Sequence, residues 1–302
     1  MTGTEDDGRG VTGTEDDGRG VTGAEDDAPG AEAEGRVLPG TDPILLVGPQ
    51  RSGTTALASA LSEAVAAQGG CFTANGKLPY LLRRWWTDED AAAGHLRSDE
   101  VTHALTRIAP YGTGADKWLG RVHTALLNST RRAAQGLAAS SVTQEIRRVC
   151  AEVYGPGPWG DKYNEYLLEL PWLHATFPGA RWVFLVRDPA DTIASMLAWR
   201  RNKPWNPEDA TAASAKWAHW TSQWLTFRDT VPARRRVELD YAALCAGRAD
   251  ALSELVGTDM TAFLTEFRRP PAQRDTSQLS PKAQEVRSEL VRLGILGDNH
   301  GR

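Results

Sequence analysis

Residues 48–55 read GPQRSGTT and are the most informative segment of the sequence. It follows the apolar run ILLV (44–47), which is typical of a short strand buried on both faces. An Ala- and Leu-rich segment, 56–68, comes next and ends at Gly69-Gly70, which predicts a helix with its stop signal. A strand, a glycine-bearing loop and a helix in this order predict a loop that cradles a phosphate-like anion.

The loop departs from the usual phosphate-binding pattern at one position, because Thr54 stands where that pattern has lysine. Backbone amides and a helix N-terminus still form an anion cradle without it. What is lost is the cation that spans the β- and γ-phosphates of a nucleoside triphosphate, while Arg51 supplies a charge at a different place. We therefore expect the loop to hold an anionic group of a nucleotide that lacks a triphosphate.

The rest of the chain predicts further strands and many helices. Apolar runs predict strands at 182–186 and 236–241, and helical patterns cover 79–86, 98–108, 118–136, 141–153, 164–176, 190–201 and 208–230. Strands separated by helices imply a parallel sheet with right-handed crossovers. We predict an α/β, helix-rich, P-loop-like three-layer domain with a central parallel sheet over residues 41–302, without an internal boundary.

The first thirty residues are a ten-residue repeat, MTGTEDDGRG, VTGTEDDGRG and VTGAEDDAPG. It has no apolar periodicity, so we expect residues 1–40 to be a disordered acidic tail. This tail has eleven acidic residues against three arginines, a net charge of −8, which leaves +3 for the remainder of a chain whose total is −5. A mildly basic body suits a small anionic ligand and is too weak to indicate nucleic acid.

Composition excludes several classes of protein. No apolar run approaches the roughly 20 residues of a membrane helix, and the first residues lack the pattern of a secretion signal. Three scattered cysteines, Cys71, Cys150 and Cys245, predict neither a disulfide framework nor a metal site. We expect a cytoplasmic protein that does not bind a membrane and needs no metal.

Two further segments contain candidate ligand-binding residues. In VRDPADTIAS (186–195), Arg187 follows a predicted strand, where open α/β sheets place their ligands, and Ser195 lies about two turns into the next helix. An arginine with a serine suits a phosphate monoester. The other segment, WGDK (159–162), lies in a Pro- and Gly-rich stretch before a helix. On its own it also fits a plain cap, with Asp161 at the helix N-terminus and Lys162 in solvent.

These three pieces, in this order, resemble the sulfotransferases that use 3′-phosphoadenosine 5′-phosphosulfate (PAPS), particularly the bacterial branch related to the tyrosylprotein enzymes. The resemblance covers roughly 43–260 and includes WGDKYNEYLLELPWLHATFPGA (159–180). It implies that the 3′-phosphate is bound by Arg187 and Ser195, and that Lys162 contacts the transferring sulfuryl group. It also implies that the 5′-phosphosulfate is bound by Arg51, Ser52, Gly53, Thr54 and Thr55, with Arg51 serving catalysis as well.

This chain departs from the family at the residue expected to accept the proton of the acceptor hydroxyl. Related enzymes often carry a glutamate about twenty residues after the loop arginine, whereas residues 69–77 here read GGCFTANGK, without a carboxylate. The alternatives left open are Asp161, Glu165, Asp116, His95, His103 and His123, or an acceptor acidic enough to need no strong base. Lys77 is expected to be a surface lysine beside a turn.

The resemblance implies a PAPS-dependent sulfotransferase whose acceptor is a hydroxyl of a small molecule, such as a secondary metabolite or glycoconjugate. Two alternatives are a small-molecule or nucleotide kinase with a P-loop, which would need magnesium, and a non-catalytic nucleotide-binding protein. Trp217, Trp220 and Trp224 share one helix face and are expected to pack against the sheet. The alternative is that some of them, together with Trp85, Trp86, Trp199 or Trp205, line an acceptor pocket for an aromatic or sugar-bearing compound.

Overall fold

The computed structural model describes residues 42–139, 141–199, 206–267 and 279–297. All of them belong to one structural unit, Val37–Arg302. The tail expected at residues 1–40 lies outside the described residues, as does Trp205.

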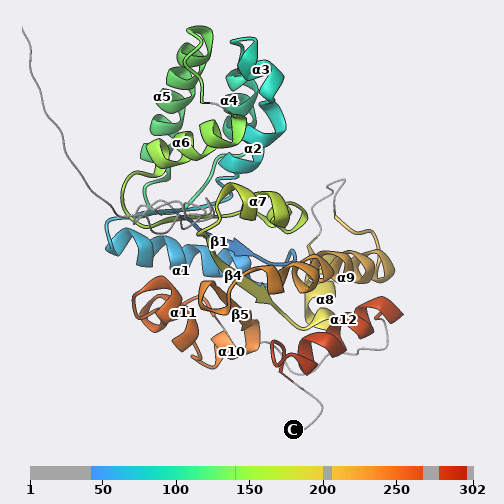
Figure 1. Cartoon of the computed structure of the whole chain (residues 1–302). Coiled ribbons are helices and arrows are strands. Elements are labelled where there is room, and N and C mark those ends of the chain that lie inside the picture. Colours follow the sequence, from blue (N-terminus) through green and yellow to red (C-terminus); the bar gives the residue numbers. More distant parts are fainter. Residues whose placement is uncertain (1–41, 140, 200–205, 268–278, 298–302) are drawn as a thin grey trace, which may run out of the picture. The chain divides into compact units, whose positions relative to one another are not determined.

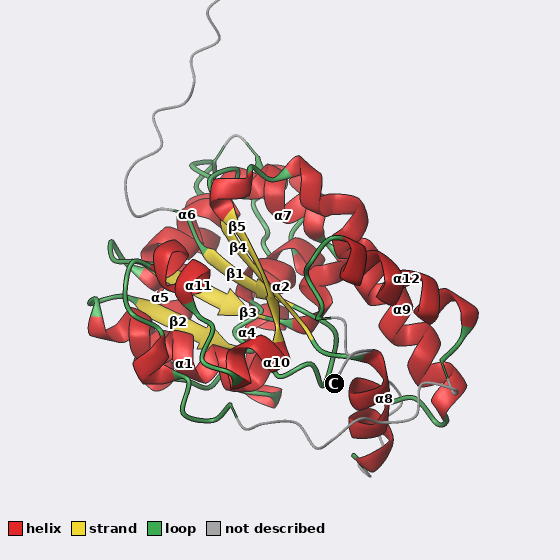
Figure 2. Cartoon of the chain, turned by 90° about the horizontal axis from the view of Figure 1, so that it is seen from below, coloured by secondary structure: helices red, strands yellow, loops and turns green. Residues whose placement is uncertain are grey.

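Five parallel strands form one sheet in the order β2-β3-β1-β4-β5 (Figure 2). The strands are β1 (Ile44–Val47), β2 (Cys71–Ala74), β3 (Trp159–Lys162), β4 (Arg181–Val186) and β5 (Arg236–Asp240). The chain places β2 and β3 on one side of β1, and β4 and β5 on the other. Open parallel sheets bind ligands at the carboxyl ends of their strands, where the strand order changes direction in this way.

Helices fill most of the remaining described chain (Figure 1). The α-helices are α1 (Thr54–Ala67), α2 (Leu78–Trp85), α3 (Asp88–Ala92), α4 (Ser98–Arg107), α5 (Ala115–Ala134), α6 (Val142–Tyr154), α7 (Leu170–Thr176), α8 (Pro189–Ala198), α9 (Ala210–Phe227), α10 (Tyr241–Cys245), α11 (Asp250–Val256) and α12 (Pro281–Arg292). Short 3-10 helices are η1 (Asn164–Leu168), η2 (Arg228–Thr230), η3 (Ala233–Arg235) and η4 (Thr261–Phe263).

The sheet is buried on both faces, because successive strand residues point to opposite sides. Ile44 and Leu46 of β1 join one apolar cluster with side chains of α1 and α11. Leu45 and Val47 join the other, which includes side chains of α2, α4–α7, α9 and α12. Helices on both faces of a parallel sheet make the predicted three-layer α/β architecture, which is therefore confirmed.

The three predicted strands are confirmed, and the predicted helices match α1, α2 and α4–α9 closely, with 164–176 divided between η1 and α7. Strands β2 and β3 were not predicted. Each has only four residues, and the Gly160-Asp161-Lys162 end of β3 lacks the apolar pattern of a buried strand. The carboxyl end of β3 instead buries two charged residues, Asp161 and Lys162.

The tryptophan prediction for α9 is also confirmed. Trp217 and Trp224 are fully buried and Trp220 is 8% exposed. Trp224 stacks on Phe184 of β4 with ring centroids 5.0 Å apart, and its indole N–H donates to Glu238 at 2.7 Å. These side chains therefore belong to the core, and Trp86, at 2% exposed, does as well.

Candidate active site

The three segments singled out in the sequence meet at the carboxyl edge of the sheet. Strand β1 leads into the loop 48–53, β3 ends at Lys162, and β4 ends one residue before Arg187. In the sheet register Lys162 lies opposite Leu46 of β1 and Ala74 of β2. The site is thus assembled by the parallel order of the strands, from residues more than one hundred positions apart.

The loop after β1 is held in an unusual backbone conformation. Arg51 and Gly53 both have positive φ, 68° and 97°. A Cβ on Gly53 would lie 2.5 Å from Tyr241 Cδ2, so glycine is required both by φ and by space. Gly53 caps α1 without a side-chain hydrogen bond, and the first turn of α1 has no acidic residue. The amides at this helix end are therefore open to an anion.

The other loop residues divide into buried and exposed groups. Ser52 is fully buried and donates its hydroxyl to the Pro49 carbonyl at 2.7 Å, which tightens the turn. Thr54 is buried at the start of α1, whereas Thr55 is exposed. Ser52 thus helps to shape the loop, and Thr55 presents a hydroxyl beside the open amides.

Arg51 links the loop to the segment after β4. Its Nε donates to Ser195 Oγ on α8 at 3.1 Å, across 144 positions of sequence. Its guanidinium also lies over the Trp199 ring, 5.5 Å from the centroid. Burial lowers the pKa of Arg51, and repulsion from Arg187 lowers it further. The repulsion between the Arg51 and Arg187 guanidinium groups favours a polyanionic ligand between them.

Two neighbours hold Arg187 at the edge of the site. It pairs with Asp191 at 3.4 Å, and its guanidinium lies 4.8 Å from the centroid of the Tyr241 ring. Its Nε is buried and has no hydrogen-bond partner among the residues that the structure describes. A buried donor left unsatisfied is costly, so this N–H fits an anion of the ligand.

The C-terminal helix α12 supports this segment, which sequence reasoning did not detect. Asp188 caps α8 by accepting from the Ala190 amide at 2.9 Å, and its other oxygen pairs with Arg287 of α12 at 3.2 Å. Arg287 thereby fixes the turn that follows β4. No local pattern in the sequence marks a contact between residues 99 positions apart.

Lys162 is buried, with 7% of its surface exposed. Burial lowers its pKa to about 8, although attraction by Glu165 and Asp161 opposes the shift. The ammonium group forms no hydrogen bond or ion pair with any residue of the described chain. The alternative of a solvated Lys162 is therefore wrong, and the side chain suits an anionic ligand.

Asp161 is neither a helix cap nor an available base. It lies inside β3, fully buried, and its carboxylate accepts four hydrogen bonds. The donors are Thr73 Oγ1 (2.8 Å), the Gly76 amide (2.9 Å), the Lys77 amide (2.7 Å) and the Tyr166 hydroxyl (2.6 Å). Burial raises the pKa of this carboxyl, and the hydrogen bonds oppose that effect. Because these donors occupy both oxygens, Asp161 holds the β2–α2 turn in place.

The expectation that Lys77 is a surface lysine is wrong. The side chain is 7% exposed, and the residue adopts a left-handed conformation, with φ 49°, where α2 begins. Burial lowers its pKa, and attraction by Glu165 and Asp161 opposes this. Its side chain, like that of Lys162, has no hydrogen-bond or ion-pair partner in the described parts of the chain. The buried carboxylate beneath the turn is what brings it inward, and no sequence signal marked that contact.

Four of the proposed proton acceptors, Asp116, His95, His103 and His123, are exposed. Glu165, in η1, is half-buried and electrostatically coupled to both unpaired lysines. Of the six candidates, Glu165 is therefore the one that combines partial burial at this edge with a carboxylate that is not filled by donors.

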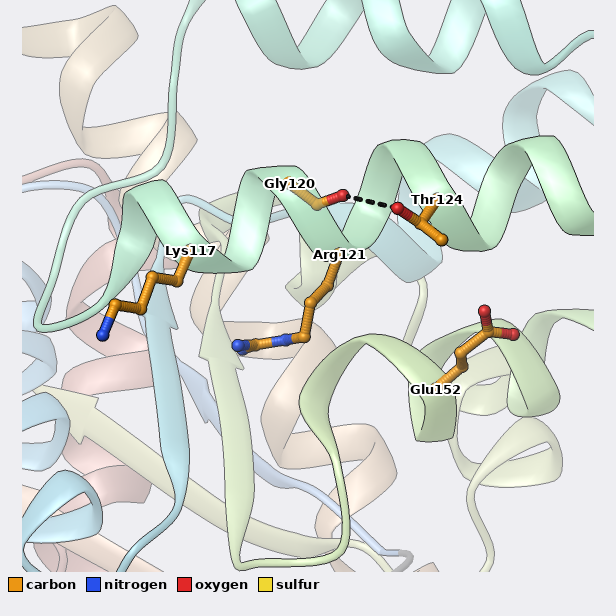
Figure 3. A pocket seen from close by; sticks show the side chains of 5 residues that line it. All are labelled: Lys117, Gly120, Arg121, Thr124 and Glu152. Carbon is orange, nitrogen blue, oxygen red and sulfur yellow. Dashed lines mark hydrogen bonds between the residues drawn. The ribbon is translucent and has the colours of Figure 1, made fainter.

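A separate pocket lies between α5 and α6 and is lined by Lys117, Gly120, Arg121, Thr124 and Glu152 (Figure 3). Arg121 donates to the Val153 carbonyl at 2.5 Å and contacts Cys71 Sγ at 3.7 Å. Cys71 begins β2, so the pocket adjoins the amino end of that strand, opposite the end that carries the site. Its arginine serves to join α5, α6 and β2.

No helix of the described chain is long and apolar enough to span a membrane. No curated protein sequence is significantly similar to this chain. Its fold is similar to that of the sulfotransferase domain of the Synechococcus PCC 7002 olefin synthase, with 15% identity and a TM-score of 0.51 over 83% of this chain and 94% of that domain. Sulfotransferase STF9 from Mycobacterium avium is 16% identical, with a TM-score of 0.45 over 85% of this chain and 76% of STF9.

Mouse sulfotransferase SULT7A1, solved with adenosine 3′,5′-bisphosphate (PAP), is 15% identical, with a TM-score of 0.37 over 85% of this chain and 77% of its own. The model of the sulfotransferase family matches residues 43–257, which include every strand and each segment of the site. That match covers well over half of the chain, and it decides among the enzyme classes that the loop sequence alone left open. The chain therefore belongs to the sulfotransferase family and is a sulfotransferase.

Proposed function

We propose that the chain transfers the sulfuryl group of PAPS to a hydroxyl of a small-molecule acceptor, such as a secondary metabolite or glycoconjugate, without a metal. The observation that carries this proposal is that Lys77 and Lys162, each 7% exposed, lie at the same edge of the sheet as an anion-binding loop and form no hydrogen bond or ion pair within the described chain. Largely buried lysines without such partners favour an anionic ligand. We further propose that residues 41–302 form the catalytic domain.

The two ends of the site suit the two charged ends of PAPS. Arg187 has an unsatisfied buried N–H, and Ser195 lies within hydrogen-bond reach of Arg51, so this end suits the 3′-phosphate. The open amides of α1, with Ser52, Gly53, Thr54, Thr55 and Arg51, suit the 5′-phosphosulfate. The threonine at position 54, in place of lysine, removes the cation that a triphosphate needs.

Sulfuryl transfer follows the physical logic of phosphoryl transfer, an in-line displacement through a loose transition state. The protein must align the acceptor with the donor and stabilise the charge that develops on the leaving oxygen. Lys162 and Arg51, the proposed catalytic residues, serve this purpose as cations at the end of β3 and in the loop. Lys77 adds a third cation, which the sequence did not predict.

The experiment is transfer from PAPS labelled with sulfur-35 to two phenolic probes, 2-naphthol and 4-nitrophenol. We expect a labelled organic sulfate to form together with PAP in equal amounts, with a rate that is unchanged by EDTA. Transfer of phosphate from Mg-ATP to either probe, with no sulfate ester formed from PAPS, would contradict the proposal.

A further inference from the structure

The proposed reaction releases a proton, and the site must accept it near the sulfuryl end. Glu165 lies three residues after Lys162, in the short helix η1, which packs against β1 and α9. Its half-buried carboxylate is thus carried by the segment that leaves β3 at the carboxyl edge of the sheet.

Lysines from three elements interact electrostatically with Glu165. Attraction to its carboxylate acts on the ammonium groups of Lys77 at the start of α2, Lys162 at the end of β3, and Lys216 on α9. Lysine is scarce in this chain, with six residues in all, and half of them interact electrostatically with this one carboxylate. Lys216 also ties this cluster to the loop, because its Nζ donates to Gln50 Oε1 at 2.9 Å.

Tyr163 supplies an aromatic wall on the same side. Its ring packs on Tyr80 of α2 with centroids 5.1 Å apart and meets Tyr166 edge-on at 5.6 Å. Tyr80 and Tyr163 are half-buried, so part of each ring remains open. An acceptor with an apolar or aromatic body would find a surface there, with its hydroxyl near the carboxylate.

The neighbouring carboxylates already have hydrogen-bond or ion-pair partners. Asp161 accepts four hydrogen bonds, Asp191 pairs with Arg187, and Asp188 pairs with Arg287. Glu165 forms no ion pair within 4 Å among the described residues, so it keeps oxygen lone pairs for an incoming proton.

We infer that Glu165 is the general base of this enzyme, in place of the glutamate missing from residues 69–77; the inference rests on the proposed function. The acceptor oxygen attacks sulfur, and its proton passes to the Glu165 carboxylate. The bond from sulfur to the bridging oxygen breaks, and PAP leaves with the electron pair on its 5′-phosphate. The proton then passes from Glu165 to solvent.

The test compares Glu165→Gln with Glu169→Gln in the full chain, using the two phenolic probes. Glu169 is a matched control, because it lies four residues further on and pairs with Arg83. We expect Glu165→Gln to lower kcat about 10²–10⁴-fold with 2-naphthol. The loss should be much smaller with 4-nitrophenol, which ionises readily without a base. PAP affinity should not fall in either variant.

A second measurement needs no turnover. Inorganic sulfate is titrated into the PAP complex of each protein, as a probe of charge at the sulfuryl end. Removing the negative charge of Glu165 should tighten sulfate binding several-fold, whereas Glu169→Gln should bind it like the wild type. Equal losses of kcat with both phenols, or unchanged sulfate affinity in Glu165→Gln, would overturn the assignment. Failure of the wild type to bind PAP would instead contradict the proposed function.

Discussion

The backbone N–H of Lys77 donates to the buried carboxylate of Asp161 at 2.7 Å, and this bond joins the start of α2 to the interior of β3. The Gly76 amide donates to the other oxygen of the same carboxylate at 2.9 Å. In addition, the Asn75 amide donates to the Lys162 carbonyl at 2.7 Å. One aspartate therefore helps to position Lys77 and Lys162, the two lysines that we propose contact the sulfuryl group.

Asp161→Asn should destabilise the protein although it changes almost no volume. An asparagine offers a single oxygen, so in either orientation of its amide one of the two backbone N–H groups loses its acceptor. The free energy of unfolding should fall by about 1–3 kcal/mol for that group. Urea denaturation measures it, with Asp116→Asn, an exposed carboxyl on α5, as the control. An unfolding free energy equal to that of the control would show that the turn does not depend on this carboxylate.

Gly53→Ala should damage the loop, because the new Cβ would meet the Tyr241 ring at 2.5 Å in a left-handed backbone conformation. We expect a large loss of PAP affinity together with lower thermal stability. Gly120→Ala is the matched control, since a Cβ there, within α5, meets nothing within 4 Å. Alanine should stabilise that helix by up to about 1 kcal/mol. Wild-type PAP affinity in Gly53→Ala would contradict the close packing of the loop on Tyr241.

Arg187→Ala and Lys162→Ala should both abolish most transfer, for different reasons. Loss of Arg187 removes charge-assisted hydrogen bonds worth about 1.5–3 kcal/mol, so PAP should bind roughly 10–100-fold more weakly. Loss of Lys162 should lower kcat about 10²–10³-fold and leave PAP affinity nearly intact. Calorimetry and initial rates separate these effects. Near-wild-type PAP affinity in Arg187→Ala would rule out its contact with the 3′-phosphate.

The pH dependence follows from Lys162, whose pKa is lowered to about 8 by burial. Above that pH the free enzyme holds a neutral amine, so kcat/KM should decline as pH rises through about 8. The bound donor is anionic and favours the protonated form, which places the corresponding decline in kcat at higher pH. Lys162→Arg keeps its positive charge, so its kcat/KM should not decline as pH rises through about 8. If the decline persists unchanged in Lys162→Arg, it arises from the titration of another group.

Sequence reasoning predicted the fold and assigned the loop 48–55 and the segment 186–195 to one ligand, because both predictions rest on local patterns and on the rule that ligands bind at the carboxyl ends of parallel strands. The hydrogen bond between Arg51 and Ser195 was not predicted. Sequence reasoning also did not predict β3 or the inward position of Lys77. Those features depend on Asp161, whose four donors come from β2, from the following turn and from η1. Residues up to 88 positions apart satisfy this buried charge, and such contacts leave no periodic signal. The support of Asp188 by Arg287 escaped prediction for the same reason.

The most direct test of the PAPS donor is calorimetric titration of the full chain with PAP, compared with ATP and magnesium. The open α1 amides, the unsatisfied Arg187 N–H and the absence of lysine at position 54 favour a bisphosphate over a triphosphate. We expect PAP to bind with a Kd on the order of micromolar, about −8 kcal/mol, and Mg-ATP far more weakly. Tighter binding of Mg-ATP than of PAP would contradict the assignment of the donor.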